Sequence, residues 1–419
     1  MRRIPVLLLI AAMSAASGLR GLKAEDARQY AVTGVEMARA GKDQEALEAF
    51  TKAIELAPRQ AVHYRNRAAL YGRMKAWDQA VQDYTTALSL QEDPSTQFNR
   101  GYSYLQLGRL EDALKDFDAV LKEQPDNERA LRFRAYLLLA ARKEPQKAVD
   151  DYDKLLARNP NDAASLKGRA DACAAMGQWD RAVADDAKAV SLNPKDSDAQ
   201  AALATACLNA GDNPRALEAL DALLEAKPDD ADALLRRAGL RYEREQFDAA
   251  IADYSKAIVL KPADAELYSG RGYARLKKGD KTGALADFSK AIELDPDRSA
   301  YYATRIYLYE LSGETAKAID DLGHLLALKP DDPNLLLRRG DLYLKAHEPD
   351  EALKDYDSVL SHDPGNVSAL AGKGQVLAQK GDRRAGAEQL QKALGFTKDP
   401  KQQEDIRAKL RALGVGPLL

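Results

Sequence analysis

A repeat of 34 residues runs through most of the chain and limits the folds that it can adopt. Prolines recur at this spacing at Pro160, Pro194, Pro228, Pro262, Pro296, Pro330 and Pro364. A small residue keeps nearly the same register at Ala46, Ala80, Ala113, Ala148, Ala182, Ala216, Ala250, Ala284, Ala318, Ala352 and Gly386. A period of this length predicts one array of repeats that contact their neighbours, although 419 residues alone would suggest two or three globular domains.

Each repeat has the pattern of two helices joined by a short turn. In the clearest example, residues 264–278 and 281–294 are predicted helices, and a Gly-Asp turn separates them. Pro296 ends this repeat, because proline cannot continue a helix and disfavours helical geometry in the residue before it. An aromatic residue four positions after the small one is predicted to pack beside it, at Phe50, Tyr84, Phe117, Tyr152, Tyr254, Phe288 and Tyr356.

One repeat combines Tyr268, Gly272, Gly279, Ala284, Phe288, Ala291 and Pro296. This combination resembles the tetratricopeptide repeat family, which has a small residue and a tyrosine on the first helix, an alanine and an aromatic residue on the second, and a closing proline. The resemblance implies an all-α fold: a right-handed α-solenoid (superhelix) of about eleven helix-turn-helix repeats over residues 27–398. It also implies that the first helices line a concave groove that holds peptides or partner proteins.

Residues 399–419 are predicted to form a capping helix and a short tail. Asp399 and Pro400 are a suitable N-cap and first helical residue. Ile406, Leu410 and Leu413 share one face of the helix, which would cover the last open core of the solenoid.

Two repeats depart from the pattern. Asp186 and Leu220 replace the aromatic residue of the second helix, and the neighbouring first helices are rich in alanine at residues 172–175 and 201–206. We expect looser packing in these repeats, and a hinge or a specialised contact there.

One arginine and one aspartate position are correlated across the repeats: a repeat has either both residues or neither. Arg67, Arg100, Arg134, Arg169, Arg237, Arg271, Arg305 and Arg339 precede the small residue of the first helix. The same repeats have Asp83, Asp116, Asp151, Asp185, Asp253, Asp287, Asp321 and Asp355 before the aromatic position of the second helix. The other three repeats lack both residues, which favours structural ion pairs, within a repeat or across one boundary, over a basic surface for acidic ligands.

The groove is the candidate binding site. The resemblance places Tyr102, Tyr136, Tyr242, Tyr273 and Tyr307 on its wall, with Arg65, Arg132 and Lys167 as a basic patch. Asp232, Glu243, Glu266 and Glu310 would make the later part more acidic. Two interpretations stay open, because exposed tyrosines suit peptide recognition whereas aromatic residues at helical spacing also pack against neighbouring helices. The lysine and asparagine pattern of family members that clamp a carboxylate terminus is not repeated in consecutive repeats.

Catalytic, metal and nucleic-acid signals are missing from the sequence. The four histidines share no ligand spacing, and no phosphate loop, nucleophile elbow or dinucleotide motif occurs, so we expect no catalytic residue, metal or cofactor. Sixty-two basic against 65 acidic residues give a net charge of -3, which disfavours nucleic acid as a partner. Cys173 and Cys207 occupy equivalent positions in adjacent repeats, and we expect buried thiols, because stacked helices lie farther apart than a disulfide allows.

The first residues have the pattern of a secretory signal. Arg2 and Arg3 precede 13 residues that are apolar apart from Ser14, which is short for a membrane span of about 18 to 20 residues. We expect residues 1–24 to be a signal peptide, with cleavage near residue 16, 18 or 24. The protein would then be periplasmic or secreted, and we expect it to belong to a bacterial cell envelope.

The leading functional hypothesis is an exported scaffold without enzymatic activity. It would bind a peptide or partner proteins in the groove and support assembly of a protein complex. The alternative is a structural subunit tethered to the membrane by an uncleaved N-terminal helix, and only in that case would the membrane be a partner.

Overall fold

The computed structural model describes residues 25–414, and the segment predicted to be a signal peptide lies outside them. The first helices of the repeats are residues 25–39, α3 (Ala61–Arg73), α5 (Pro94–Gln106), α7 (Glu128–Ala140), α9 (Ala163–Ala175), α11 (Ser197–Ala210), α13 (Ala231–Glu243), α15 (Ala265–Lys277), α17 (Ser299–Ser312), α19 (Pro333–Lys345) and α21 (Val367–Gln379). The second helices are α2 (Asp43–Leu56), α4 (Trp77–Leu90), α6 (Leu110–Glu123), α8 (Pro145–Arg158), α10 (Trp179–Leu192), α12 (Asn213–Ala226), α14 (Phe247–Leu260), α16 (Lys281–Leu294), α18 (Thr315–Leu328), α20 (Pro349–His362) and α22 (Arg383–Phe396). No strand occurs between residues 25 and 414, and the prediction of an all-α solenoid of helical hairpins is confirmed.

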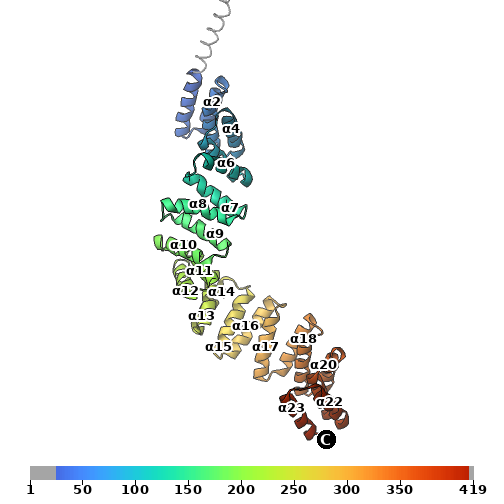
Figure 1. The fold of residues 1–419 in the computed structure, drawn as a ribbon. Helices are drawn as coiled ribbons and strands as arrows, with labels where there is room; N and C mark the ends of the chain where they lie inside the picture. The colour runs from blue at the N-terminus through green and yellow to red at the C-terminus, as the bar shows by residue number, and fades with distance from the viewer. Residues whose placement is uncertain (1–24, 415–419) are drawn as a thin grey trace, which may run out of the picture. The chain divides into compact units, whose positions relative to one another are not determined.

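The chain divides into two compact units, Met1–Ala219 and Leu220–Leu419. From α2 to α11 and from α13 to α23, each helix packs against the next one along the chain, and Figure 1 shows the succession of hairpins. First helices of adjacent repeats also contact each other, for example α7 with α9 and α13 with α15. Each unit is therefore a stack of repeats whose core lies between neighbouring helices.

The small residue of the second helix packs with the aromatic residue four positions later, as predicted: Ala284 and Phe288 belong to one buried cluster. Phe288 and Tyr356 are completely buried. A Cβ atom added to Gly272 would lie 3.1 Å from the Phe288 ring, and one added to Gly340 would lie 3.0 Å from the Tyr356 ring. The glycine on the first helix thus allows the aromatic ring of the same repeat to approach the backbone.

Tyrosine rings also reach the next repeat. A Cβ atom added to Gly372 would lie 2.4 Å from Tyr356, and one added to Gly270 would lie 2.6 Å from Tyr254. Gly168 has the same relation to Tyr152 of the preceding repeat. These glycines stand two residues before the small position, so the sequence already contains this pairing of a tyrosine with a glycine in the following repeat.

The two residues that replace the aromatic are both buried. Leu220 is 1% exposed and Asp186 is 4% exposed, so neither replacement opens the core to solvent. The division between the compact units falls between Ala219 and Leu220, inside one of the two departing repeats. The hinge or specialised contact expected there stays a prediction.

The last helix, α23 (Pro400–Ala412), begins at the predicted residues. Asp399 is its N-cap, and its side chain accepts a hydrogen bond from the backbone N–H of Lys401 at 2.9 Å. Ile406 and Leu410 are buried in a cluster with Leu390 of α22. This helix therefore covers apolar surface of the final repeat.

No helix between residues 25 and 414 combines the length and the apolar composition that a bilayer crossing requires.

The turn between the two helices of a repeat contains a residue in the left-handed region. Glycine fills this position in most repeats, at Gly41, Gly108, Gly177, Gly211, Gly279, Gly313 and Gly381. Four repeats place a residue with a side chain there, at Lys75, Lys143, Glu245 and His347, with φ values from 53° to 60°. A left-handed conformation costs an L-residue about 1–2 kcal/mol, so these four turns store strain that the glycine turns avoid.

Replacing Glu245 by glycine should therefore raise stability. The gain should be about 0.5–1 kcal/mol, because relief of the left-handed conformation exceeds the entropy that glycine loses on folding. The matched control is Gly279→Ala, in which the same position has φ 84° and should lose a comparable amount. Thermal unfolding monitored by circular dichroism measures both, and a lower midpoint for Glu245→Gly would contradict the prediction.

Candidate functional site

The predicted Arg–Asp pairs all form, and each one lies within a repeat. Between guanidinium nitrogens and carboxylate oxygens the distances are 2.6–3.2 Å, and two nitrogens of each arginine bind one carboxylate. The aspartates are only 1–7% exposed. The pairs, called the Arg–Asp ladder below, are Arg67–Asp83, Arg100–Asp116, Arg134–Asp151, Arg169–Asp185, Arg237–Asp253, Arg271–Asp287, Arg305–Asp321 and Arg339–Asp355.

Seven of these arginines also donate a third hydrogen bond to the preceding repeat. The acceptors stand one residue after the aromatic position of the second helix, and the distances are 2.6–3.3 Å. They are Thr51, Thr85, Asp118, Asp153, Asp221, Ser255 and Ser289. Arg339 faces Gly323 at this position, where a Cβ atom would lie 3.9 Å from its Nη1, so no side chain is present to accept.

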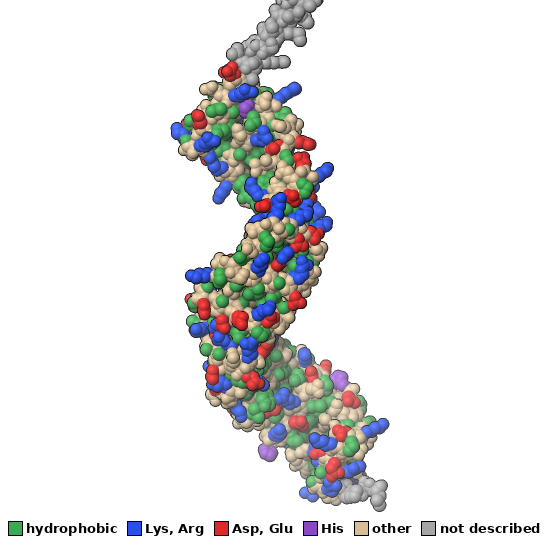
Figure 2. Space-filling view, turned by 60° about the vertical axis from the view of Figure 1, so that its left-hand side comes forward, with side chains coloured by type: hydrophobic (Ala, Val, Ile, Leu, Met, Phe, Trp, Pro, Cys, Tyr) green, Lys and Arg blue, Asp and Glu red, His purple; other side chains and the backbone are tan. Residues whose placement is uncertain are grey.

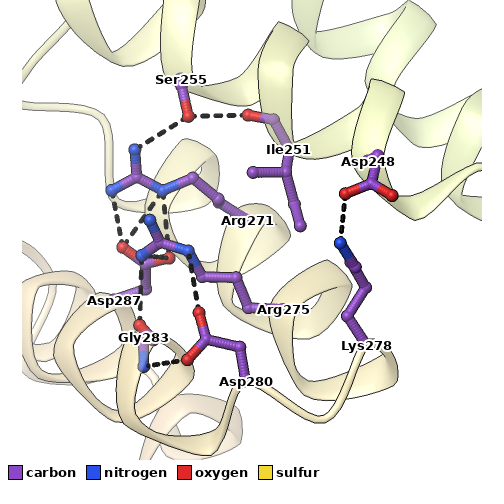
Figure 3. Close-up of polar contacts among 9 residues, drawn as sticks. All are labelled: Asp248, Ile251, Ser255, Arg271, Arg275, Lys278, Asp280, Gly283 and Asp287. Carbon is purple, nitrogen blue, oxygen red and sulfur yellow. Dashed lines mark hydrogen bonds and ion pairs between the residues drawn. The ribbon is translucent and has the colours of Figure 1, made fainter.

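Figure 3 shows the arrangement in one repeat. Arg271 on α15 donates to Asp287 on α16 and, at 3.1 Å, to Ser255 on α14 of the preceding repeat. Arg275, one turn further along α15, binds the same carboxylate at 2.8 Å. The arginines of this ladder are therefore occupied by internal acceptors and are not free to bind an acidic ligand.

Sequence reasoning missed two parts of the ladder. The third acceptor was visible as a recurrent Thr, Ser or Asp, but its residue type varies more than that of the paired aspartate. Arg241 and Arg275 were also missed as second donors to Asp253 and Asp287, since they occur in two adjacent repeats only. Hydrogen bonding to the carboxylate also has an electrostatic result: the bond to Asp116 raises the pKa of Arg100.

Three of the predicted groove tyrosines are packed against neighbouring rings. Tyr102 makes an edge contact with Trp77 at 6.0 Å between ring centroids and with Phe133 at 5.6 Å. Tyr242 contacts Phe247 at 5.6 Å.

Tyr273 is packed in the same way. It contacts Phe288 at 4.9 Å between ring centroids, and its hydroxyl shares a hydrogen bond with Thr304 at 3.2 Å. Like Tyr102 and Tyr242, it therefore contributes to packing between helices.

The other two predicted tyrosines are available to a ligand. Tyr136 on α7 is 54% exposed, and Tyr307 on α17 is 49% exposed. Leu311, one turn after Tyr307, is 48% exposed, so the two form a small apolar surface on one helix. The compact unit Met1–Ala219 contains one exposed tyrosine of the groove set, and Leu220–Leu419 contains the other.

The predicted basic patch is partly neutralised by internal pairing. Arg65 lies 3.3 Å from Asp93, and Arg132 lies 2.7 Å from Asp162. Each aspartate is the N-cap of the first helix of the next repeat. Lys167, in contrast, forms no ion pair with any residue from 25 to 414.

The predicted acidic positions behave similarly. Asp232 pairs with Lys261 at 2.6 Å, and Glu310 pairs with Arg338 at 2.8 Å. Acidic and basic side chains are interspersed over the face shown in Figure 2. Long-range charge therefore contributes little to selecting a partner, and local chemistry must do so.

The side chains of Cys173 and Cys207 are both free thiols, and both are completely buried. Burial raises the pKa of Cys207 to about 11. Among the described residues, no group of three or more His, Cys, Asp or Glu side chains is placed to hold a metal ion.

Comparison with family models identifies the repeats. A model described as "Tetratricopeptide repeat" matches residues 98–163, 134–201 and 337–402, and two further models of that description match residues 187–238 and 265–298. A model described as "TPR repeat" matches residues 239–279. Together these matches cover more than half of the 419 residues.

Curated relatives share only part of their length with this chain. Small glutamine-rich tetratricopeptide repeat-containing protein 2 of Saccharomyces cerevisiae is 40% identical over 111 residues, which is 25% of this chain and 30% of that protein. Serine/threonine-protein phosphatase 5 of Homo sapiens is 30% identical over 111 residues, which is 26% of this chain and 22% of that protein. The chain thus spans less than a third of these relatives.

A solved structure shows the same kind of partial similarity. The crystal structure of YrrB, a TPR protein with an unusual peptide-binding site, is 24% identical and covers 46% of this chain and 98% of its own, with a TM-score of 0.39.

The loss of stability on removing a ladder arginine should depend on whether its aspartate keeps another donor. Arg305→Ala leaves Asp321 buried without a donor, and should cost about 3 kcal/mol of the free energy of unfolding. Arg271→Ala should cost less, because Arg275 still binds Asp287. Urea unfolding of both variants measures the difference, and a larger loss for Arg271→Ala would contradict this account.

The two cysteines should be unreactive in the folded protein. Because both are buried and the pKa of each is raised by burial, we expect a thiol reagent at pH 8 to modify neither one. After denaturation without a reductant, two thiols per chain should react. A count of zero in the denatured protein would instead reveal a disulfide.

Proposed function

Because the chain belongs to the tetratricopeptide repeat family, we propose that it is an exported scaffold without enzymatic activity that binds a peptide or partner proteins in its groove. The observation that carries the proposal is the exposure of Tyr136 and Tyr307, which occupy the same position on first helices of different repeats. We further propose that this binding supports the assembly of a protein complex.

The two exposed tyrosines offer a ligand more surface than the three packed, partly buried tyrosines of the groove set do. Half of each side chain is open to solvent, so a ligand can cover an apolar ring and also bind a hydroxyl group. Aromatic residues of this kind contribute much of the energy in protein interfaces. Tyr307 has the additional support of Leu311 one turn away, which enlarges the apolar contact.

The internal pairing of the ladder arginines limits the kinds of ligand that the chain can recognise. The arginines that line up along the repeats are bound to buried aspartates, so a general affinity for acidic peptides has no donor set to support it. Recognition therefore depends on exposed aromatic and apolar groups together with charges outside the ladder, Lys167 among them.

Export is the second part of the proposal. It is supported by the basic start, the short apolar segment and the small residues that follow within residues 1–24. The alternative is a membrane tether formed by the same segment. N-terminal sequencing of the mature protein after fractionation separates the two, because a soluble product that starts after residue 16 contradicts the tether, whereas a membrane-bound product with Arg2 and Arg3 retained contradicts export.

A photocrosslinking residue at position 136 or 307 of the full chain should trap a partner in the native host. The matched control is position 259, because Val259 is 80% exposed but lies on α14, a second helix. Equal adducts from positions 259, 136 and 307 would contradict binding at the first helices.

Substitution of the tyrosines should separate recognition from packing. Tyr307→Ala should weaken capture of the crosslinked partner about tenfold with an unchanged melting temperature, since truncation of an interface aromatic costs about 1–2 kcal/mol. Tyr273→Ala should lower the melting temperature, because this ring packs on Phe288. A stability loss at position 307 with normal binding would reverse the assignment.

A further inference from the structure

Asp186 occupies a position that elsewhere belongs to a large apolar side chain. Tyr152 and Tyr254 fill it in two other repeats, and Leu322 fills it in a third. Asp186 is only 4% exposed, yet it takes part in no hydrogen bond or ion pair with the residues from 25 to 414. The carboxylate oxygens of Asp186 keep some contact with solvent, but a carboxylate so largely removed from water without a protein partner is costly, so its retention requires an explanation.

The contacts of Tyr356 show which residues surround this position in another repeat. Its hydroxyl donates a hydrogen bond at 2.6 Å to Asp341, which stands one residue after the small position of the first helix. Its ring also lies against Gly372 on the first helix of the next repeat. The space filled by the ring therefore lies beneath the groove-facing residue, between two first helices.

The repeat of Asp186 has different residues around the same space. The residue equivalent to Asp341 is Asp171 on α9, which is exposed, and the charges of Asp171 and Asp186 repel each other. The next repeat places Ala202 of α11 opposite, in the position of Gly372. An aspartate side chain is shorter than a tyrosine ring, so Asp186 fills less of this position than Tyr356 does in its own repeat.

The charges around this space do not balance when both aspartates are ionised. Asp186 interacts electrostatically with Lys167 and Asp171 of α9 and with Asp185 of α10, and of these Asp185 is paired with Arg169 at 2.7 Å. The Cys207 thiol of α11 also interacts with Asp186 and is neutral at pH 8, because burial raises its pKa to about 11. Two carboxylates thus share the one cation of Lys167.

We propose that Asp171 and Asp186 form an acidic notch in the groove that binds a cationic side chain, lysine or arginine, of a partner peptide. The inference rests on the proposed function in that a peptide lies in the groove, and it adds the chemistry of one contact. The inserted cation would supply the hydrogen bonds that Asp186 lacks and the charge that Lys167 does not balance.

Binding at this notch should depend on pH. Burial, with smaller contributions from Asp171 and Asp185, raises the pKa of Asp186 to about 7. The folded chain therefore holds a proton that the unfolded chain has released between about pH 4 and pH 7, so in the free protein stability falls as pH rises through this window. A cation that binds the ionised carboxylate should bind more tightly at pH 8 than at pH 6.

Two capped, fluorescent heptapeptides of glycine and serine test the proposal on the full chain, one with a central lysine and one with the neutral norleucine. Fluorescence anisotropy at pH 8 should show roughly tenfold tighter binding of the lysine peptide, and the preference should shrink at pH 6. Equal or undetectable binding of both peptides at pH 8 would overturn the proposal.

The variants separate the notch from the fold. Asp186→Leu should fold well, since leucine is buried at this position in other repeats, and it should lose the lysine preference and the pH dependence. Asp171→Asn, at an exposed position, gives the same test without touching the core, and Asp180→Asn on the exposed start of α10 is the control. Retention of the preference in both Asp186→Leu and Asp171→Asn would overturn the notch.

The same variants distinguish this proposal from the proposed function. If crosslinkers at positions 136 and 307 trap a partner equally well in Asp186→Leu and in the unaltered chain, the groove binds a partner without using the notch. If they trap none in the unaltered chain while the lysine peptide still binds, the proposed function fails and the notch remains.

Discussion

Each of eight helical hairpins buries the carboxylate of one aspartate, and an arginine of the same hairpin neutralises it. Seven of the same arginines also link a repeat to its neighbour. The two parallel hydrogen bonds to the aspartate fix the guanidinium plane. With that plane fixed, the remaining nitrogen points at the second helix of the preceding repeat, where a hydroxyl or carboxylate accepts in seven cases. Packing of small against large residues then sets how closely the helices approach.

This arrangement decides which residues remain for function. Most of the regularly spaced arginines belong to the ladder. Their positive charge is therefore neutralised by buried aspartates and is not available to a ligand. Arg65 and Arg132 are likewise paired with aspartates, which are the N-caps of the next first helices. The recognition that we propose uses groups outside the ladder, chiefly the half-exposed tyrosines of α7 and α17 and the carboxylates of Asp171 and Asp186.

Much of this could be predicted because the chain contains its own alignment. The loss of arginine and aspartate in the same three repeats identified the ion pairs, and only their placement within a repeat needed the structure. The exposure of the groove tyrosines could not be predicted from spacing, since it depends on neighbours such as Trp77, Phe247 and Thr304 that stand at different offsets. The burial of Asp186 without a partner was also invisible, because a sequence position predicts neither solvent access nor the absence of hydrogen bonds.

The third hydrogen bond, which seven of the arginines make, affects how such a chain can change its length. Most repeats of the ladder bring their own arginine, their own aspartate and an acceptor for the repeat that follows, whereas Ala187 and Gly323 offer no acceptor. Where the acceptor is present, duplication or deletion of one whole repeat in the gene leaves donors and acceptors matched on both sides of the new junction. A change of any other length inside a helix would separate them, whereas a turn can absorb a single residue: Arg134 and Asp151 stand 17 residues apart instead of the 16 between Arg100 and Asp116, and both pairs form.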